Sequence, residues 1–164
     1  MKQAFRVTNQ KTEARFRTFC KENGISRKQI HFYYHGSLAE NFWSILTKGL
    51  TVHPNAKIAG KMFGHGSYFA TRARKSLRYT DIGNIHASHA KTGVLAVFKV
   101  AYKHPWNIHA WKPSYTELRY KKVKENGYDA VFAHAGKDLL NDEIIVYQDC
   151  QSTICYLLEM EQPK

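Results

Sequence analysis

The segment GKMFGHGSYFATRARKSLRYT, residues 60–80, is the most informative part of this chain for its fold. It opens with the glycines of an exposed loop that begins near Leu50, passes through an apolar segment at 66–70 that predicts a short buried strand, and ends in a basic helix over 71–79. Its glycines match neither a P-loop nor the GxGxxG fingerprint. Any nucleotide site here must therefore be built differently from a Rossmann crevice.

Hydrophobic periodicity predicts the elements on either side of this stretch. Upstream we expect a strand at 4–7, an amphipathic helix at 11–23 that stops at Gly24, a strand at 29–34 that feeds a turn at 35–37, and a helix at 38–48. Downstream we expect a central strand at 93–102, a helix at 114–126 capped by Ser114, and strands at 130–133, 143–147 and 153–160. The fold class is α+β, with a mainly antiparallel β-sheet core and flanking helices.

Charge gives the first indication of a ligand. The formal net charge of +12 favours phosphate-rich ligands or an acidic partner. No acidic residue lies between Glu40 and Asp81, an interval that holds seven lysines and arginines, whereas acids return near the C-terminus. A cationic middle segment and a late carboxylate could form one site for a dianionic ligand. A solvated basic face would give the same pattern.

Some classes of protein are disfavoured. No apolar run approaches the ~20 residues that span a bilayer, and the first ten residues lack the apolar core of a secretory signal, so we expect an intracellular protein, cytoplasmic or nuclear, without a membrane partner. The cysteines form no CxxC pair, and His86 and His89 have no third ligand near them in sequence. We therefore expect no metal site.

Four segments together resemble the catalytic domain of the poly(ADP-ribose) polymerase family. They are YHGS at 34–37 with Asn41-Phe42 at the family spacing, GKMFGHGSYFA at 60–70, KSLRY at 75–79, and LLNDEIIVY at 139–147. They occur in the family's order, and the resemblance covers nearly the whole chain. It implies one catalytic domain over residues 1–164, folded as a split β-sheet like that of diphtheria-type toxins. The chain departs from nuclear members of the family in that we expect no helical regulatory domain.

The resemblance also implies NAD as the donor co-substrate, with His35, Tyr68 and Glu143 as catalytic residues. By resemblance, His35 would hydrogen-bond the adenosine-side ribose, and Tyr68 and Tyr79 would sandwich the cationic nicotinamide ring with a cation–π contribution of ~1–2 kcal/mol. Further donor-binding residues implied in this way are Gly36, which lets the nicotinamide amide approach the backbone, the Ser76 hydroxyl, Ser37 and Asn41.

Glu143 is the residue on which the implied chemistry depends. Breaking the bond between nicotinamide and ribose leaves positive charge on the ribose, as in glycoside hydrolysis, and a carboxylate stabilises that charge. Removing one such preorganised group commonly costs ~10²–10³ in rate. The same carboxylate could orient an acceptor hydroxyl, so no catalytic Ser or Cys is needed.

The acceptor is less well defined. Lys61, Met62 and His65 border the acceptor side by resemblance, and Lys61 and His65 differ from the residues of large nuclear members. Retention of Glu143 leaves both mono- and poly(ADP-ribose) products open. We expect the acceptor to be a protein or a nucleic acid. A nucleic acid is considered because residues 103–124 interleave aromatic and basic side chains, which suit phosphate contact with base stacking. A solvated helix over core aromatics would give the same pattern of residues. We expect a monomer.

Two other functions fit the pattern less well. A catalytically silent module that binds NAD, ADP-ribose or nucleic acid would have little chemical need for Glu143. A tRNA 2′-phosphotransferase uses a related fold and NAD, but its arginine/histidine set around the phosphate is not found in this sequence.

Overall fold

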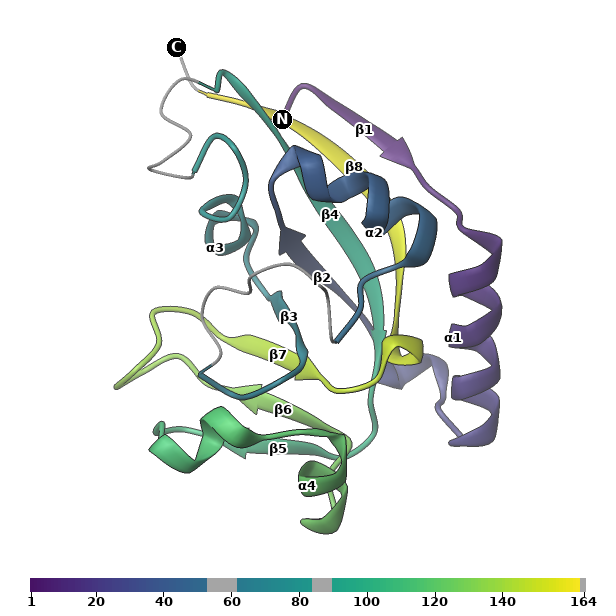
Figure 1. Ribbon diagram of the computed structural model, residues 1–164, viewed down its shortest axis with the longest axis vertical. Coiled ribbons are helices and arrows are strands. Elements are labelled where there is room, and N and C mark those ends of the chain that lie inside the picture. Colours follow the sequence, from purple (N-terminus) through teal and green to yellow (C-terminus); the bar gives the residue numbers. More distant parts are fainter. Residues whose placement is uncertain (53–61, 84–89, 163–164) are drawn as a thin grey trace.

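The computed structural model describes residues 1–52, 62–83 and 90–162, which form one mixed sheet with helices packed on it (Figure 1). The strand order is β1-β8-β4-β2-β3-β7-β6-β5, and every described pairing is antiparallel except that of β5 with β6. This confirms the predicted α+β class with a mainly antiparallel core. The strands are β1 Gln3–Arg6, β2 Ile30–Gly36, β3 Ser67–Ala70, β4 Thr92–Ala101, β5 Pro105–Ile108, β6 Ala130–Ala133, β7 Glu143–Val146 and β8 Ser152–Glu161.

The helices are short, apart from the first. Asn9 caps α1 by accepting hydrogen bonds from the backbone N–H groups of Lys11 and Thr12, at 3.0 and 3.1 Å. Phe16 and Phe19 lie at helical spacing in α1 and are buried, as the sequence predicts. No described helix is long and apolar enough to cross a membrane. The helices are α1 Gln10–Glu22, α2 Phe42–Lys48, α3 Ala73–Leu77 and α4 Tyr120–Glu125.

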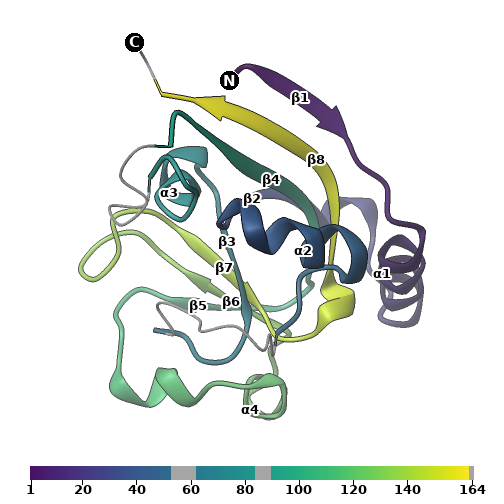
Figure 2. The ribbon, with the colours of Figure 1, turned by 45° about the horizontal axis from the view of Figure 1, so that its top comes forward.

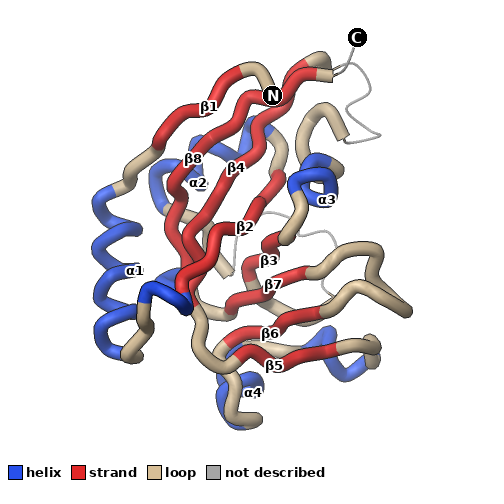
Figure 3. Tube along the Cα trace, turned by 180° about the vertical axis from the view of Figure 1, so that it is seen from behind, coloured by secondary structure: helices blue, strands red, loops and turns tan. Residues whose placement is uncertain are grey.

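The sheet is split between β2 and β3. These two strands share a single register pair, Tyr34 with Ala70, whereas β2 pairs with β4 at seven positions and β3 with β7 at four. Seen from behind, the two half-sheets run in different directions on either side of this point (Figure 3). The split sheet that the family resemblance implies is therefore present.

Each half-sheet has its own apolar core. In the β2–β4–β8 half, Phe42 and Ile45 of α2 pack with Tyr33 and Phe98, and α2 covers the face of the strands turned away from the viewer in Figure 3. In the other half, a second buried cluster forms under α4 and the segment before it; its members are Phe63, Ile108, Leu118, Val123, Val131, Ala133, Ile145 and Tyr147.

One helix prediction is wrong. The segment predicted as a single helix over 114–126 divides into a 3₁₀ helix, Pro113–Glu117, and α4, because Leu118 and Arg119 adopt extended backbone between them. Leu118 is buried, and its carbonyl accepts a hydrogen bond from the His65 N–H at 2.8 Å. Tertiary contact with residues 62–66, which we call the glycine loop, therefore overrides the local helical periodicity. Ser114 lies inside the 3₁₀ helix.

The sequence prediction also missed β5. This strand begins with a proline, which cannot donate to a sheet ladder and so argues against a strand. The structure tolerates Pro105 because β5 is an edge strand, which among the described strands pairs with β6 alone.

Candidate active site

The predicted catalytic residues lie around the split in the sheet. His35 and Gly36 end β2, Tyr68 lies in the middle of β3, and Glu143 begins β7. In both views α3 lies on the same side of the molecule as the loop that leads into β7 (Figure 1, Figure 2). The register places Glu143 opposite Ala70 of β3 on one side and Ala133 of β6 on the other. The site is thus assembled from both half-sheets.

His35 joins the two half-sheets directly. Its Nδ1 lies 2.9 Å from the Tyr68 backbone oxygen. A carbonyl can only accept, so Nδ1 donates and the neutral ring keeps Nε2 as an acceptor. Phe69 and Phe98 pack around the ring at centroid distances of 5.9 and 6.0 Å. Burial lowers the pKa of His35 below its ordinary value, although the hydrogen bond with Tyr68 opposes that change.

Tyr68 ties the glycine loop to β3. Its hydroxyl accepts a hydrogen bond from the Phe63 N–H at 3.0 Å and donates one to the Gly64 carbonyl at 2.8 Å. Burial raises the pKa of Tyr68 well above its usual range, and nearby Tyr79 adds to the increase. Tyr68 therefore remains a neutral phenol. Tyr79 is about half exposed, at 49%, and is close enough to Tyr68 to influence its ionisation.

Gly36 allows α3 to pack against β2. A Cβ at this position would collide with the backbone carbonyl of Ser76, so no larger residue fits without moving the helix. The buried Ser76 hydroxyl donates to the Tyr34 carbonyl at 3.0 Å. Both of these predicted donor-binding residues therefore hold α3 in place, a structural role that the sequence interpretation did not include.

Glu143 forms a buried ion pair with Lys75 of α3. The side chains are only 11% and 14% exposed, respectively. Burial, together with the nearby Arg78, lowers the pKa of Lys75 to about 8, and Asp142 opposes that change. Lys75 is a candidate functional residue that the sequence prediction did not single out. The cationic interval ending at Asp81, set against a late carboxylate, was the signal that could have identified it.

The remaining predicted residues lie at the edges of the site. The Asn41 side-chain amide donates to the Ser37 hydroxyl at 3.0 Å in the turn after β2. The Met62 carbonyl accepts from the Trp111 indole at 2.7 Å, and the His65 backbone is bound to Leu118. Lys61, like His86 and His89, lies outside the described residues. In the part of the chain that the structure describes, no group of three or more His, Cys, Asp or Glu side chains is placed to hold a metal ion.

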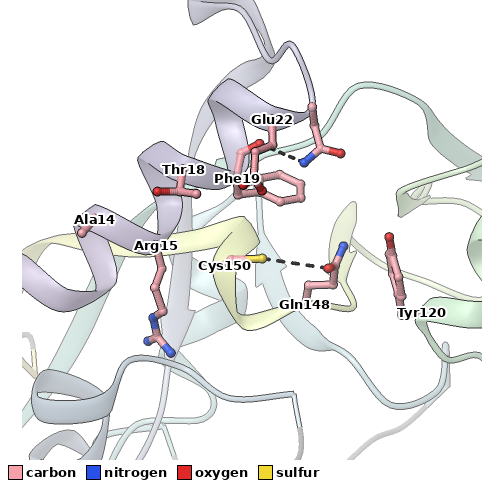
Figure 4. Close-up of a pocket in the computed structure, with 9 residues that line it drawn as sticks. Ala14, Arg15, Thr18, Phe19, Glu22, Tyr120, Gln148 and Cys150 are labelled. Atoms are coloured by element: carbon pink, nitrogen blue, oxygen red, sulfur yellow. Dashed lines mark hydrogen bonds between the residues drawn. The ribbon is translucent and has the colours of Figure 1, made fainter.

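A separate cavity of about 440 Å³ lies between α1, α4 and the segment before β8 (Figure 4). The residues that line it are Ala14, Arg15, Thr18, Phe19, Glu22, Asn23, Tyr120, Gln148 and Cys150. None of them belongs to the predicted catalytic or donor-binding set. The cavity is therefore distinct from the candidate active site at the split.

Comparison with known proteins identifies the family. The family model "Poly(ADP-ribose) polymerase catalytic domain" matches residues 1–131, which include His35 and Tyr68 and end before Glu143. The chain is 29% identical over 160 residues to a putative poly [ADP-ribose] polymerase-like protein, 100L, of Invertebrate iridescent virus 6, an alignment that covers 95% of this chain and 83% of the viral protein.

Two animal proteins are also similar. Poly [ADP-ribose] polymerase 1 of Xenopus laevis is 32% identical over 161 residues, with 82% of this chain and 16% of that protein covered. Poly [ADP-ribose] polymerase of Drosophila melanogaster is 31% identical over 180 residues, with 96% and 17% covered. The chain thus spans less than a fifth of these longer relatives. It belongs to the poly(ADP-ribose) polymerase catalytic-domain family and is an NAD ADP-ribosyltransferase.

Proposed function

We propose that this chain transfers ADP-ribose from NAD to a protein or nucleic-acid acceptor and releases nicotinamide, with His35, Tyr68 and Glu143 as catalytic residues. The observation that carries the proposal is the buried Glu143–Lys75 ion pair at the same split that the His35–Tyr68 hydrogen bond bridges. A buried carboxylate held in place by Lys75, at a split that also carries a neutral histidine and a neutral tyrosine, is suited to stabilise a developing positive charge.

Donor binding follows from the chemistry of these side chains. The free Nε2 of neutral His35 would accept a hydrogen bond from a ribose hydroxyl of NAD. The rings of Tyr68 and Tyr79 would lie on either side of the nicotinamide, whose positive charge adds a cation–π attraction. The backbone of Gly36 and the hydroxyl of Ser76 would bind the nicotinamide amide, and Ser37 and Asn41 would border the adenosine side.

The transfer step exchanges one bond for another. The glycosidic bond from C1″ of the ribose to nicotinamide breaks, and its electron pair leaves with neutral nicotinamide. An acceptor oxygen forms the new bond to C1″, and its proton passes through Glu143 to solvent. Glu143 would polarise the 2″-hydroxyl and stabilise the oxocarbenium-like charge while the bond breaks. The acceptor supplies the nucleophile.

The decisive experiment uses labelled NAD with protein, DNA and RNA acceptors, followed by protease or nuclease digestion and sizing of the label. Label released by nuclease indicates a nucleic-acid acceptor, and label released by protease indicates a protein acceptor. The length of the labelled ADP-ribose product distinguishes single units from polymer. If the chain releases no nicotinamide with any acceptor and transfers no label to itself, the proposal of transferase activity fails and a silent NAD-binding module becomes the better description.

Lys75 is expected to act as a positioning residue for Glu143. Lys75→Met removes a charge-assisted contact, a type of bond worth ~1.5–3 kcal/mol, so we expect kcat for nicotinamide release to fall by about 10-fold with a smaller change in KM. Lys75→Arg keeps the charge and should restore part of the loss. A Lys75→Met enzyme with unchanged kcat, measured alongside its thermal unfolding, would show that the ion pair serves stability alone.

The state of His35 predicts a dependence on pH. Its lowered pKa in the fold means that the unfolded chain binds this proton more readily. Stability that is present above the ordinary histidine pKa, ~6.5, is therefore lost as pH falls below that value. We expect the Tm to drop between pH 7.5 and 5.5, and to drop less in His35→Gln. Half-buried His31, whose pKa is also lowered by burial, is present in both proteins and serves as an internal reference. Parallel pH curves for the two proteins would contradict the assignment.

A further inference from the structure

Three arginines lie on α3 and its two flanking residues, in the segment that follows β3. Arg72, Arg74 and Arg78 are all exposed, and none of the described ion pairs includes them. We call them the arginine rim. Arg74 and Arg78 are four positions apart, so their like charges destabilise a helix by a few tenths of a kcal/mol. Internal stability therefore does not explain the cluster.

The neighbouring acids are already engaged. Asp81 accepts a hydrogen bond from the Ala39 N–H at 2.9 Å, Asp142 accepts one from the Ala135 N–H at 2.8 Å, and Glu143 is paired with Lys75. These acids are held by other partners, so the positive charge of the arginine rim can attract an anionic ligand from solution.

The rim is held rigidly beside the reaction centre. The Ser76 hydrogen bond to Tyr34 and the close approach of Ser76 to Gly36 fix α3 against β2. Lys75 follows Arg74 directly in α3, and Arg78 caps the C-terminal end of that helix. Arg78 is near enough to Lys75 to lower the pKa of the lysine. Arg78 is therefore close to Lys75 and, through that ion pair, to Glu143, so a ligand that contacts Arg78 lies near the carboxylate.

We propose that the acceptor is a single-stranded nucleic acid whose phosphates pair with the arginine rim while its nucleophilic oxygen enters the split; the proposal rests on the transferase function above. Planar guanidinium groups bind phosphate in a bidentate manner, and the net charge of +12 attracts a polyanion from a distance. Because Glu143 is only 9% exposed, the reacting group must leave any base-paired stack to reach it, which favours a flexible strand.

The test compares two triple variants with equal loss of charge. One replaces the arginine rim (Arg72→Gln, Arg74→Gln, Arg78→Gln), and the control replaces three exposed lysines of α4 (Lys121→Gln, Lys122→Gln, Lys124→Gln). Binding of a fluorescent single-stranded DNA and its RNA counterpart is measured by anisotropy without NAD, over a range of salt concentrations. The second readout uses NAD and compares how much ADP-ribose is transferred to the oligonucleotide with how much is hydrolysed by water. This ratio does not depend on the affinity for NAD.

Each phosphate contact to a single strand contributes ~0.7 to the slope of log K against log salt. We expect loss of the arginine rim to reduce that slope by ~2, to weaken binding roughly 100-fold at ~0.1 M salt, and to shift the partition toward water. The α4 control should change much less.

Equal losses in the two variants, or a larger loss in the α4 control, would overturn the proposal in favour of general charge or of the α4 surface. Binding of an acidic peptide but no oligonucleotide would assign the rim to a protein acceptor and would also overturn it. The binding assay needs no catalysis, so it distinguishes this failure from a failure of the transferase proposal, which nicotinamide release by the unmodified chain reports.

Discussion

Glu143→Gln is expected to lower the rate of nicotinamide release at least ~10²-fold, the scale for removal of one preorganised electrostatic group. The substitution preserves the shape of the side chain and leaves an amide oxygen that can accept from Lys75. It removes the negative charge that would stabilise the ribose cation. We therefore expect the effect in kcat, with NAD affinity changed far less. Initial rates at saturating NAD, with NAD binding measured separately by calorimetry, give this comparison.

The matched control for this substitution is Asp142→Asn. Asp142 is the adjacent carboxylate, but its oxygen accepts the Ala135 N–H and forms no described ion pair with Lys75. Its replacement removes the same charge one residue away and should have a much smaller effect on kcat. Circular dichroism and thermal unfolding establish that both variants are folded. A folded Glu143→Gln protein that turns over at the unmodified rate would exclude Glu143 from the mechanism.

The second large effect is expected for Gly64→Ala. Gly64 has a φ of +77°, and a Cβ there would run into the backbone of Leu118. A left-handed conformation costs an L-residue about 1–2 kcal/mol, and overpacking adds typically 1–3 kcal/mol. We expect the free energy of unfolding to fall by roughly 2–5 kcal/mol. Activity should fall too, because the Gly64 carbonyl holds the Tyr68 hydroxyl.

Gly127→Ala separates the two contributions. Gly127 has a similar φ, +85°, but a Cβ there meets nothing within 4 Å. This variant should lose only the conformational part, about 1–2 kcal/mol, and should retain activity. Urea unfolding of both variants measures the difference, which is the cost of the collision with Leu118. If the two variants lose the same free energy of unfolding, the backbone near Leu118 can move away from the added methyl group at Gly64 without an energetic penalty.

The elements that sequence predicted well are those whose signals are local. α1 has an Asn cap and apolar residues at helical spacing, and β4 alternates along its length, so neither depends on knowledge of its neighbours. The predictions that failed involve distant partners. The helix expected over 114–126 breaks because Leu118 packs against the glycine loop, and β5 forms because β6 offers a pairing edge that tolerates Pro105.

The candidate site, like the fold, has features that the sequence predicted and features that depend on distant contacts. Residue spacing identified His35, Tyr68 and Glu143 as a set, because the four motifs that contain them keep a common order. Their catalytic roles stay predictions until the variants are measured. Spacing gave no means of pairing Glu143 with Lys75, or of assigning the ring nitrogen of His35 that faces Tyr68, since those contacts cross the split between strands distant in the chain.

Periodicity and motif spacing are properties of the chain alone, and they were enough to predict the α+β class, the family and a set of candidate catalytic residues. Only the tertiary structure decided how these residues act on one another. Burial of Glu143 against Lys75 and of His35 between two half-sheets depends on which strands pair across the split. The same packing leaves Arg72, Arg74 and Arg78 exposed, which is the basis for the proposed contact with an anionic acceptor.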